Sequence, residues 1–404
     1  MKLIKLILPF LIVLHIEVIA AENIELIILN PFYLAYSKDK INKNDAPYVK
    51  LYSKLCADAE IALQKGPFSV VDKKTIPPSG NIHDYMSLGP YWWPDSSQPD
   101  GLPYIRRDGI VNPERYLYDN VPLANLDTAV TQLALAYYFS GREKYAKHAA
   151  QLIKAWFLDK ETYMNPHLKY GQAIKGRVEG RGIGIIDTRA FIRVAEAIGL
   201  ISASDRWSQT DQAAMVDWFN KYLDWLVNSD YGVDEREHKN NHGTWYDVLV
   251  TSLAIFTGRN ELAKDILQQV SHKRIAVQID SEGKQPFEIE RTRAYHYSMM
   301  NLAGLFQLAL IAEKYGIDLW SYRSETGSSL RLALEYLLPF ARREKKWPYQ
   351  MIRGWENDIQ TISLLLRIAA QKYNFPLYEE IIEELPGDNL NSLQLKLLFP
   401  NTRL

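Results

Sequence analysis

The chain has 404 residues, of which 47% are hydrophobic and 24% charged, a balance that supports a full-sized core and excludes general disorder. Its formal net charge of −1 argues against general nucleic-acid binding, which requires a basic face. Cys56 is the single cysteine, so no intramolecular disulfide can form and stability must come from packing.

The first residues predict a cleaved signal peptide over 1–20. Two lysines precede an apolar run from Leu6 to Ile19, and two alanines follow it. The alternative is a membrane anchor, but a span needs about 20 uninterrupted apolar residues and Glu17 falls inside this run. No later stretch is long and apolar enough to cross a bilayer. We therefore expect a periplasmic or secreted protein whose mature chain, 21–404, forms one domain without a membrane span.

Two long segments lack helical periodicity. Val71–Arg115 is rich in proline, glycine and aromatic residues, and Asn165–Asp187 is rich in glycine. Long irregular segments within a compact domain are usually functional or else disordered, and the aromatic content argues against disorder. We expect both segments to form loops around the active site.

From about Asp127 to the end, apolar residues recur at helical spacing with short breaks between the runs. The clearest stripes are Tyr145, Ala149, Leu152, Ile153 and Trp156, then Met215, Trp218, Phe219, Tyr222 and Leu226, then Leu302, Leu305, Phe306 and Ala309. This pattern predicts repeated antiparallel helix pairs packed around one continuous core. The expected fold is all-α, an α/α toroid or incomplete barrel with long active-site loops.

One polar motif precedes a predicted helix start. The amides of Asn240 and Asn241 and the imidazole of His242 adjoin one another, and such groups can together hold a carboxylate. The structural alternative is that an asparagine caps the helix and His242 is a satisfied buried histidine. His238 and His242 have zinc-motif spacing, but Lys239 stands where a zinc protease needs glutamate. We therefore expect no metal and no other cofactor.

A second motif, Gln285–Tyr297, leads into a predicted helix. It places two arginines and two tyrosines within the seven residues from Arg291 to Tyr297. The structural alternative is a solvated, charged helix entry in which Glu288 and Glu290 pair with the arginines.

Together these motifs resemble those of the alginate lyase families. In those helical lyases an Asn-His pair on one helix faces a tyrosine that follows an arginine on another, and Asn241-His242 and Arg291–Tyr297 fit that arrangement. The segments His83–Pro94 and Met164–Ala173 are also similar to this group. The resemblance thus spans most of the mature chain.

Within the group, the chain most resembles polysaccharide lyase family 38, which is described for alginate and glucuronan cleavage with an α/α toroid fold. It departs from the short bacterial alginate lyases of family 5, whose arginine lies seven residues before the tyrosine. Glu290 occupies that position here, and Arg291 lies six residues before Tyr297. The assisting arginine is therefore Arg291 or Arg293.

The resemblance implies β-elimination at a 4-linked uronate of an acidic polysaccharide. Asn241 and His242, with Arg291 or Arg293, would stabilise the charge that develops on the carboxylate when C5 loses its proton. Tyr297 would be the acid, and also the base when proton and leaving oxygen lie on the same side of the ring; otherwise His242 is the base. Free tyrosine titrates near about 10, so a tyrosine base needs nearby positive charge, which the two arginines offer.

A further set of residues is predicted to bind the polymer. The aromatic rings would stack on sugars, and the amide and guanidinium groups would bind hydroxyls and carboxylates; core packing is the alternative for each tryptophan. The set is Tyr91, Trp92, Trp93, Gln172, Arg181 and Arg189.

Two other classes compete with a lyase. An α/α-barrel glycoside hydrolase needs two carboxylates flanking the bond, but the sequence singles out no pair among Asp187, Asp247, Glu288 and Glu356. A non-catalytic glycan-binding protein of an uptake system would leave Asn241-His242 and the Arg–Tyr motif unexplained.

Overall fold

The computed structural model describes residues 25–352, 354, 358–385 and 395–402. The predicted signal peptide and Glu356 lie outside these residues. Within them, no helix combines the length and apolarity that crossing a bilayer requires.

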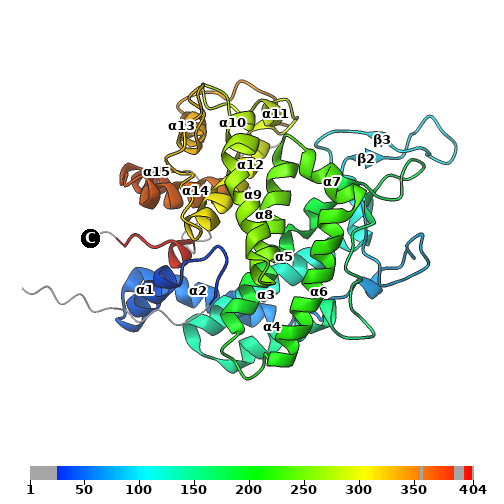
Figure 1. Cartoon of the computed structure of the whole chain (residues 1–404), viewed down its shortest axis with the longest axis horizontal. Coiled ribbons are helices and arrows are strands. Elements are labelled where there is room, and N and C mark those ends of the chain that lie inside the picture. Colours follow the sequence, from blue (N-terminus) through cyan, green and yellow to red (C-terminus); the bar gives the residue numbers. More distant parts are fainter. Residues whose placement is uncertain (1–24, 353, 355–357, 386–394, 403–404) are drawn as a thin grey trace, which may run out of the picture.

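Helices dominate the molecule, as the stripes predict (Figure 1). They are α1 (Pro31–Asn42), α2 (Ala46–Ala62), α3 (Asn120–Ser140), α4 (Glu143–Phe157), α5 (Ala190–Ile201), α6 (Gln209–Asn228), α7 (Asp230–Glu237), α8 (Asn241–Phe256), α9 (Asn260–Val270), α10 (Ala276–Gln278), α11 (Pro286–Ile289), α12 (Ala294–Glu313), α13 (Leu330–Ala341), α14 (Ile359–Lys372) and α15 (Leu377–Glu384). Short 3₁₀ or π helices add η1 (Val70–Asp72), η2 (Pro113–Leu117), η3 (Gly182–Arg189) and η4 (Ser271–Ile275).

The helices form two layers around one core. Helices α3, α5, α8, α12 and α14 pack side by side in series, while α4, α6, α9 and α13 flank them. Of the 16 residues of α8, 13 are buried, so this helix is covered on nearly every side, as an inner helix must be. By contrast, α9 buries only Ala263, Leu267 and Val270, the single stripe of an outer helix. The predicted helical toroid or incomplete barrel is confirmed.

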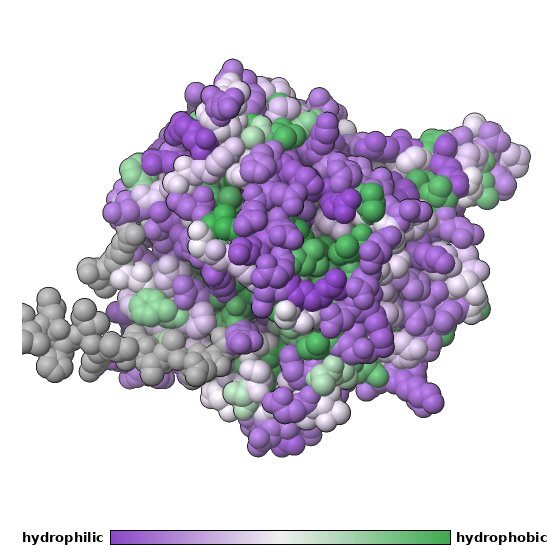
Figure 2. Space-filling view, viewed as in Figure 1, coloured by the Kyte–Doolittle hydropathy of each residue, from purple (hydrophilic) through white to green (hydrophobic). Residues whose placement is uncertain are grey.

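Polar side chains cover most of the face shown in Figure 2, with hydrophobic residues confined to small patches. The predicted stripes lie beneath this polar surface. Trp156 on α4 and Tyr222 on α6 are completely buried in the core.

The two irregular segments meet each other. Strand β1 (Met86–Leu88) of the first pairs in parallel with β4 (Tyr170–Ala173) of the second. Strands β2 (Trp92–Trp93) and β3 (Ile105–Arg106) form an antiparallel arm that projects from the helical body (Figure 1). The loops expected at an active site therefore form one connected wall.

The start of the described chain is hydrogen-bonded to both α5 and the end of α12, which are far apart in the sequence. The buried carboxylate of Glu196 on α5 accepts the backbone N–H groups of Ile27 at 3.1 Å and Leu29 at 2.8 Å, and that of Ile28 between them. Lys314, next to the end of α12, donates from Nζ to the carbonyl of Leu26 at 2.7 Å. We call residues 26–29 the N-terminal strap.

Candidate active site

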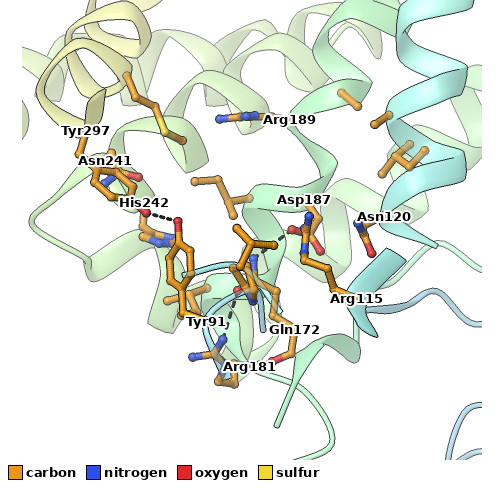
Figure 3. A pocket seen from close by; sticks show the side chains of 18 of the residues that line it. Tyr91, Arg115, Asn120, Gln172, Arg181, Asp187, Arg189, Asn241, His242 and Tyr297 are labelled. Atoms are coloured by element: carbon orange, nitrogen blue, oxygen red, sulfur yellow. Dashed lines mark hydrogen bonds between the residues drawn. The ribbon is translucent and has the colours of Figure 1, made fainter. Parts of the chain in front are cut away.

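The wall and the starts of α8 and α12 enclose a cleft of about 660 Å³ (Figure 3). Nine of the eleven predicted site residues line it: Tyr91, Trp92, Gln172, Arg181, Arg189, Asn241, His242, Arg291 and Tyr297. Trp93 and Arg293 are not among the lining residues. Trp93 instead donates from Nε1 to the carbonyl of Ile110 at 2.9 Å, and Arg293 forms a backbone bridge with Met351.

Two roles were predicted for the motif that contains Asn240 and Asn241, helix capping and carboxylate binding. Asn240 has the first, and Asn241 is placed for the second. Asn240 caps α8, because its side-chain oxygen accepts the backbone N–H of His242 at 3.1 Å. Asn241 lies in the cleft wall and is held by Glu288, to which it donates from its backbone N at 2.6 Å and from Nδ2 at 2.8 Å. The residue that caps the helix and the amide that lines the cleft are thus neighbours in the chain.

Glu288 is fully buried, so it does not form the solvated ion pair with an arginine that was the structural alternative for this motif. Burial raises the pKa of the Glu288 carboxyl to about 7, although the two hydrogen bonds from Asn241 act to lower it. Its role in the structure is to fix the Asn241 amide at the cleft.

His242 is oriented by a carboxylate that the sequence analysis did not select. Its Nδ1 lies 2.9 Å from Oε1 of Glu235, which is completely buried at the end of α7. Because a carboxylate accepts the Nδ1 proton, Nε2 is the ring nitrogen left with a free lone pair. This arrangement provides an oriented base.

Tyr297, the predicted acid, also lines the cleft. Its hydroxyl lies 2.5 Å from the hydroxyl of Tyr91, and the Arg291 guanidinium carbon lies 4.0 Å from the centre of its ring. Burial and Tyr91 raise the pKa of Tyr297, and Arg291 offsets only part of this rise. Without substrate, Tyr297 is therefore protonated and can act as an acid. The positive charge of Arg291 alone would have favoured the ionised form.

Arg291, rather than Arg293, is the arginine that lines the cleft beside Tyr297. Its Nη2 lies 3.1 Å from Oδ1 of Asp108, a residue of the irregular wall. Burial opposes ionisation of Asp108, but hydrogen bonds from Arg291 and Arg106 hold the pKa of this carboxyl well below its usual range. Asp108 thus fixes the guanidinium over the Tyr297 ring.

The backbone of the wall has special requirements at Gln172 and Gly180. Gln172 adopts a left-handed conformation, with φ of 50°, and its side chain bonds to Asp187 at 3.0 Å and to Arg181 at 3.2 Å. Gly180 lies nearby, where a Cβ would come within 1.9 Å of the Lys169 carbonyl oxygen.

Two of the predicted site arginines have no carboxylate partner within the part of the chain that the structure describes. Arg181 donates hydrogen bonds to Gln172 and lies over the Trp92 ring, and burial lowers its pKa to about 10. Arg189 lies over the Trp245 ring at 5.6 Å, and burial, together with the nearby charge of Arg193, lowers its pKa. Two uncompensated charges in a cleft favour an anionic ligand.

Two positioning residues, Glu235 and Asp108, were missed by the sequence analysis. Glu235 lies seven residues before His242, in a run of charged residues typical of a solvated surface, and Asp108 lies in a segment without periodicity. Across the described ranges, no group of three or more His, Cys, Asp or Glu residues is arranged to hold a metal ion.

The fold is a helical toroid whose cleft brings together most of the residues selected from the sequence. A family model described as alginate lyase matches residues 69–347, and the chain belongs to this family. An alginate lyase from Bacteroides ovatus is 39% identical, with a TM-score of 0.89 over 94% of this chain and 100% of that one.

More distant relatives share the fold or part of the sequence. Alginate lyase A1-III from Sphingomonas species A1 has a TM-score of 0.59 at 15% identity over 92% of this chain and 97% of that one, a likeness of fold alone. The alginate lyase of Pseudomonas syringae pv. tomato is 33% identical over 124 residues, which cover 30% of this chain and 31% of that protein. The match thus spans about a third of that relative's length.

Proposed function

We propose that this protein cleaves 4-linked uronic-acid polymers, alginate first among them, by β-elimination. The observation that carries the proposal is the meeting of Asn241, His242, Arg291 and Tyr297 in one cleft, although they come from separate segments of the chain. These groups supply what elimination requires, namely donors for a carboxylate, a base and an acid.

The first requirement is to stabilise the charge that develops on the carboxylate when C5 loses its proton. The Nδ2 group of Asn241 carries two hydrogens, and Glu288 takes one of them at 2.8 Å. The other hydrogen, with the Arg291 guanidinium, is available to the substrate carboxylate. Because Glu288 and Asp108 fix both donors beforehand, little reorganisation is needed during the reaction.

The second requirement is proton transfer. The Nε2 atom of His242 accepts the C5 proton in substrates whose leaving oxygen lies on the opposite face, and the protonated Tyr297 gives its proton to the departing O4. For the other stereochemistry Tyr297 serves as both base and acid, after losing its proton with the help of Arg291. The Tyr91 hydroxyl, 2.5 Å away, relays that proton by giving its own proton to water as it accepts the one from Tyr297, so that Tyr297 alone ends ionised.

A glycoside hydrolase is less consistent with the carboxylates in the cleft. Among its described lining residues the carboxylates are Asp127, which pairs with Arg193, and Asp187, which accepts hydrogen bonds from three side chains. Of the other candidates, Asp247 is buried against Arg274 and Glu288 is bound to Asn241. No two free carboxylates face each other there, as hydrolysis would require.

One assay separates the three functional classes. The purified protein is incubated with polymannuronate, polyguluronate and glucuronan while the ultraviolet absorbance of the unsaturated uronate end is followed, with Tyr297→Phe as the control variant. We expect absorbance to rise with the wild type and not with the variant. New reducing ends without absorbance would instead identify a hydrolase, and binding without either signal would identify a capture protein.

We further propose that the chain belongs to polysaccharide lyase family 38 and accepts glucuronan as well as alginate. The support is the position of Arg291, six residues before Tyr297, where the family 5 pattern has a spacing of seven. Cleavage of alginate without any cleavage of glucuronan would argue against this assignment.

We also propose that residues 1–20 are removed on export to the periplasm or the medium. The support is the basic start, apolar run and alanine pair of the sequence. Mass spectrometry of the protein from cell fractions tests this: an intact Met1 on cytoplasmic protein would contradict it.

A further inference from the structure

The cleft extends well beyond the reactive group. Figure 3 shows Arg115 and Asn120 on the opposite side of the pocket from His242 and Tyr297, with Gln172 between them. Arg115 lies on η2 and Asn120 is the first residue of α3. Neither residue has a part in the proposed elimination.

Arg115 carries a charge that nothing in the described chain compensates. It has no carboxylate partner there, and its Nε is buried without a hydrogen-bond partner. Asn120 holds it in place: in the amide orientation that satisfies both groups, Oδ1 accepts from Arg115 Nη1 at 3.3 Å and Nδ2 donates to the Arg115 carbonyl at 2.6 Å. A fixed guanidinium of this kind is suited to a carboxylate.

The two acidic residues on this side of the cleft are engaged elsewhere. Asp127 pairs with Arg193, and Asp187 accepts from the hydroxyls of Tyr85 at 3.1 Å and Ser87 at 2.6 Å. Neither forms an ion pair with Arg115, so its charge remains available to a ligand.

Tyr116 adds an aromatic face to this charged group. It lines the cleft beside Arg115, yet 55% of it is exposed to solvent, which is high for a large aromatic residue. A sugar acid presents a flat apolar face, hydroxyls and a carboxylate. The tyrosine ring, the asparagine amide and the guanidinium match these three features in turn.

We propose that Arg115, Tyr116 and Asn120 form a distal subsite for a uronate unit of the polymer that does not itself react. This inference rests on the proposed function. Its consequence is a dependence on chain length, because only an oligomer long enough to reach from Tyr297 to Arg115 gains the additional binding.

The test measures kcat/KM for oligomannuronates of increasing length, with wild type, Arg115→Gln, Tyr116→Ala and the control Arg323→Gln, an exposed arginine outside the cleft. We expect a rise of tenfold or more in the wild type at the length that reaches the subsite, the effect of about one charged hydrogen bond. Arg115→Gln should abolish this step, Tyr116→Ala should reduce it, and the control should keep it. Rates on oligomers below that length should stay within twofold of wild type.

A purely structural role for Arg115 gives a different pattern. Arg115→Gln would then lower kcat/KM by the same factor at every length, together with the unfolding temperature, and Tyr116→Ala would leave the length dependence intact. Either result, or a wild type without a length step, would overturn the subsite. Absence of unsaturated product from every wild-type reaction would instead contradict the proposed function.

Discussion

At the residue scale, the carboxylates that matter most are those that position other groups. Glu235 fixes the His242 ring through Nδ1, and Glu288 and Asp108 do the same for Asn241 and Arg291. Each holds one of the proposed catalytic side chains in one orientation before the substrate arrives, which reduces the reorganisation that the proposed reaction needs.

The Glu235–His242 pair leads to a first prediction. In Glu235→Gln the amide oxygen can still accept from Nδ1, but it does not stabilise the imidazolium that forms when Nε2 takes a proton. We expect kcat to fall about 10- to 100-fold, with KM within about twofold of wild type. Steady-state kinetics on polyguluronate measure this, with circular dichroism to check the fold. An unchanged kcat would show that the pair has no role in proton transfer.

A second prediction concerns the division of labour between His242 and Tyr297. His242→Ala should lower the rate mainly on polymers that need a base opposite the leaving oxygen, whereas Tyr297→Phe should lower it on all of them. The loss of a general acid or base is typically about 10²- to 10⁴-fold. The measurement is the rate of each variant on polymannuronate and polyguluronate. Equal residual rates of His242→Ala on both polymers would refute the division.

The buried Glu288 gives a third prediction, on stability. Its pKa is about 7 in the folded protein against an ordinary value of 4.5, so the folded state binds more protons between these values. The stability from this group is fully present below pH 4.5 and is lost as the pH rises through 7. Relative to Glu288→Gln, the wild type should therefore lose up to about 3 kcal/mol of unfolding free energy over this window.

Urea unfolding at pH values on either side of the window measures the difference. Glu290→Gln, which replaces an exposed carboxylate two residues away, is the control and should follow the wild type. Parallel pH profiles of wild type and Glu288→Gln would contradict a raised pKa for this carboxyl.

Local geometry decides which of the predicted site residues line the cleft. Trp92 and Trp93 are successive residues of β2, so their side chains leave opposite faces and only one can line the cleft. Arg293 immediately precedes α12, and its backbone is bound to the neighbouring segment at Met351. Sequence motifs selected side chains that the structure brings together in one cleft, but not Glu235, because its contact with His242 depends on how α7 lies against α8.

At the element scale, the junction of α7 and α8 sets the position of His242. Gly243 has no room for a side chain, because a Cβ would lie 2.1 Å from the His238 carbonyl oxygen and 2.4 Å from Nη1 of Arg274. Arg274 is itself buried and bonded to Asp247 at 2.7 Å. The glycine of this motif thus lets the start of α8 approach the preceding loop.

The fourth prediction follows from this close approach. Gly243→Ala should destabilise the protein by about 2 to 3 kcal/mol and displace His242, with a matching loss of kcat. The control is Gly258→Ala, at φ of 77° with nothing within 4 Å of the added Cβ, which should cost about 1 kcal/mol and leave kcat unchanged. Thermal unfolding and steady-state rates of both variants provide the comparison. Equal effects on kcat would contradict the argument.

The helices were predictable because each carries its own apolar stripe, as Tyr145 to Trp156 does in α4. The pairing of β1 with β4 was not. These strands are short, and Met86 meets Tyr170 from a separate segment across an irregular register. Neither strand has a local sequence pattern that identifies its partner. The sequence therefore indicated two loops but not that they pair.

At the scale of the whole molecule, the N-terminal strap joins parts of the ring that are far apart in the chain. Glu196 belongs to α5 and Lys314 follows α12, and residues 26–29 lie across both. The strap therefore helps to fix the curvature of the helical layers on which the cleft depends.

The fifth prediction tests the strap. Glu196→Ala leaves three backbone N–H groups without their acceptor and should reduce the unfolding free energy by about 3 kcal/mol. It should also speed amide exchange at residues 26–29. Glu25→Ala removes an exposed carboxylate at the same end of the described chain and is the matched control. Equal exchange in the two variants would mean that the strap is held by other contacts.

The pairing of β1 with β4 also affects how polymer preference could be exchanged between related enzymes. The helical layers carry Asn241, His242 and Tyr297, whereas the wall carries Tyr91, Gln172 and Arg181. Since the wall's two segments are hydrogen-bonded to each other, they constitute one exchangeable module. Grafting both from a relative would transfer its polymer preference intact, whereas grafting one alone would leave a strand without its partner.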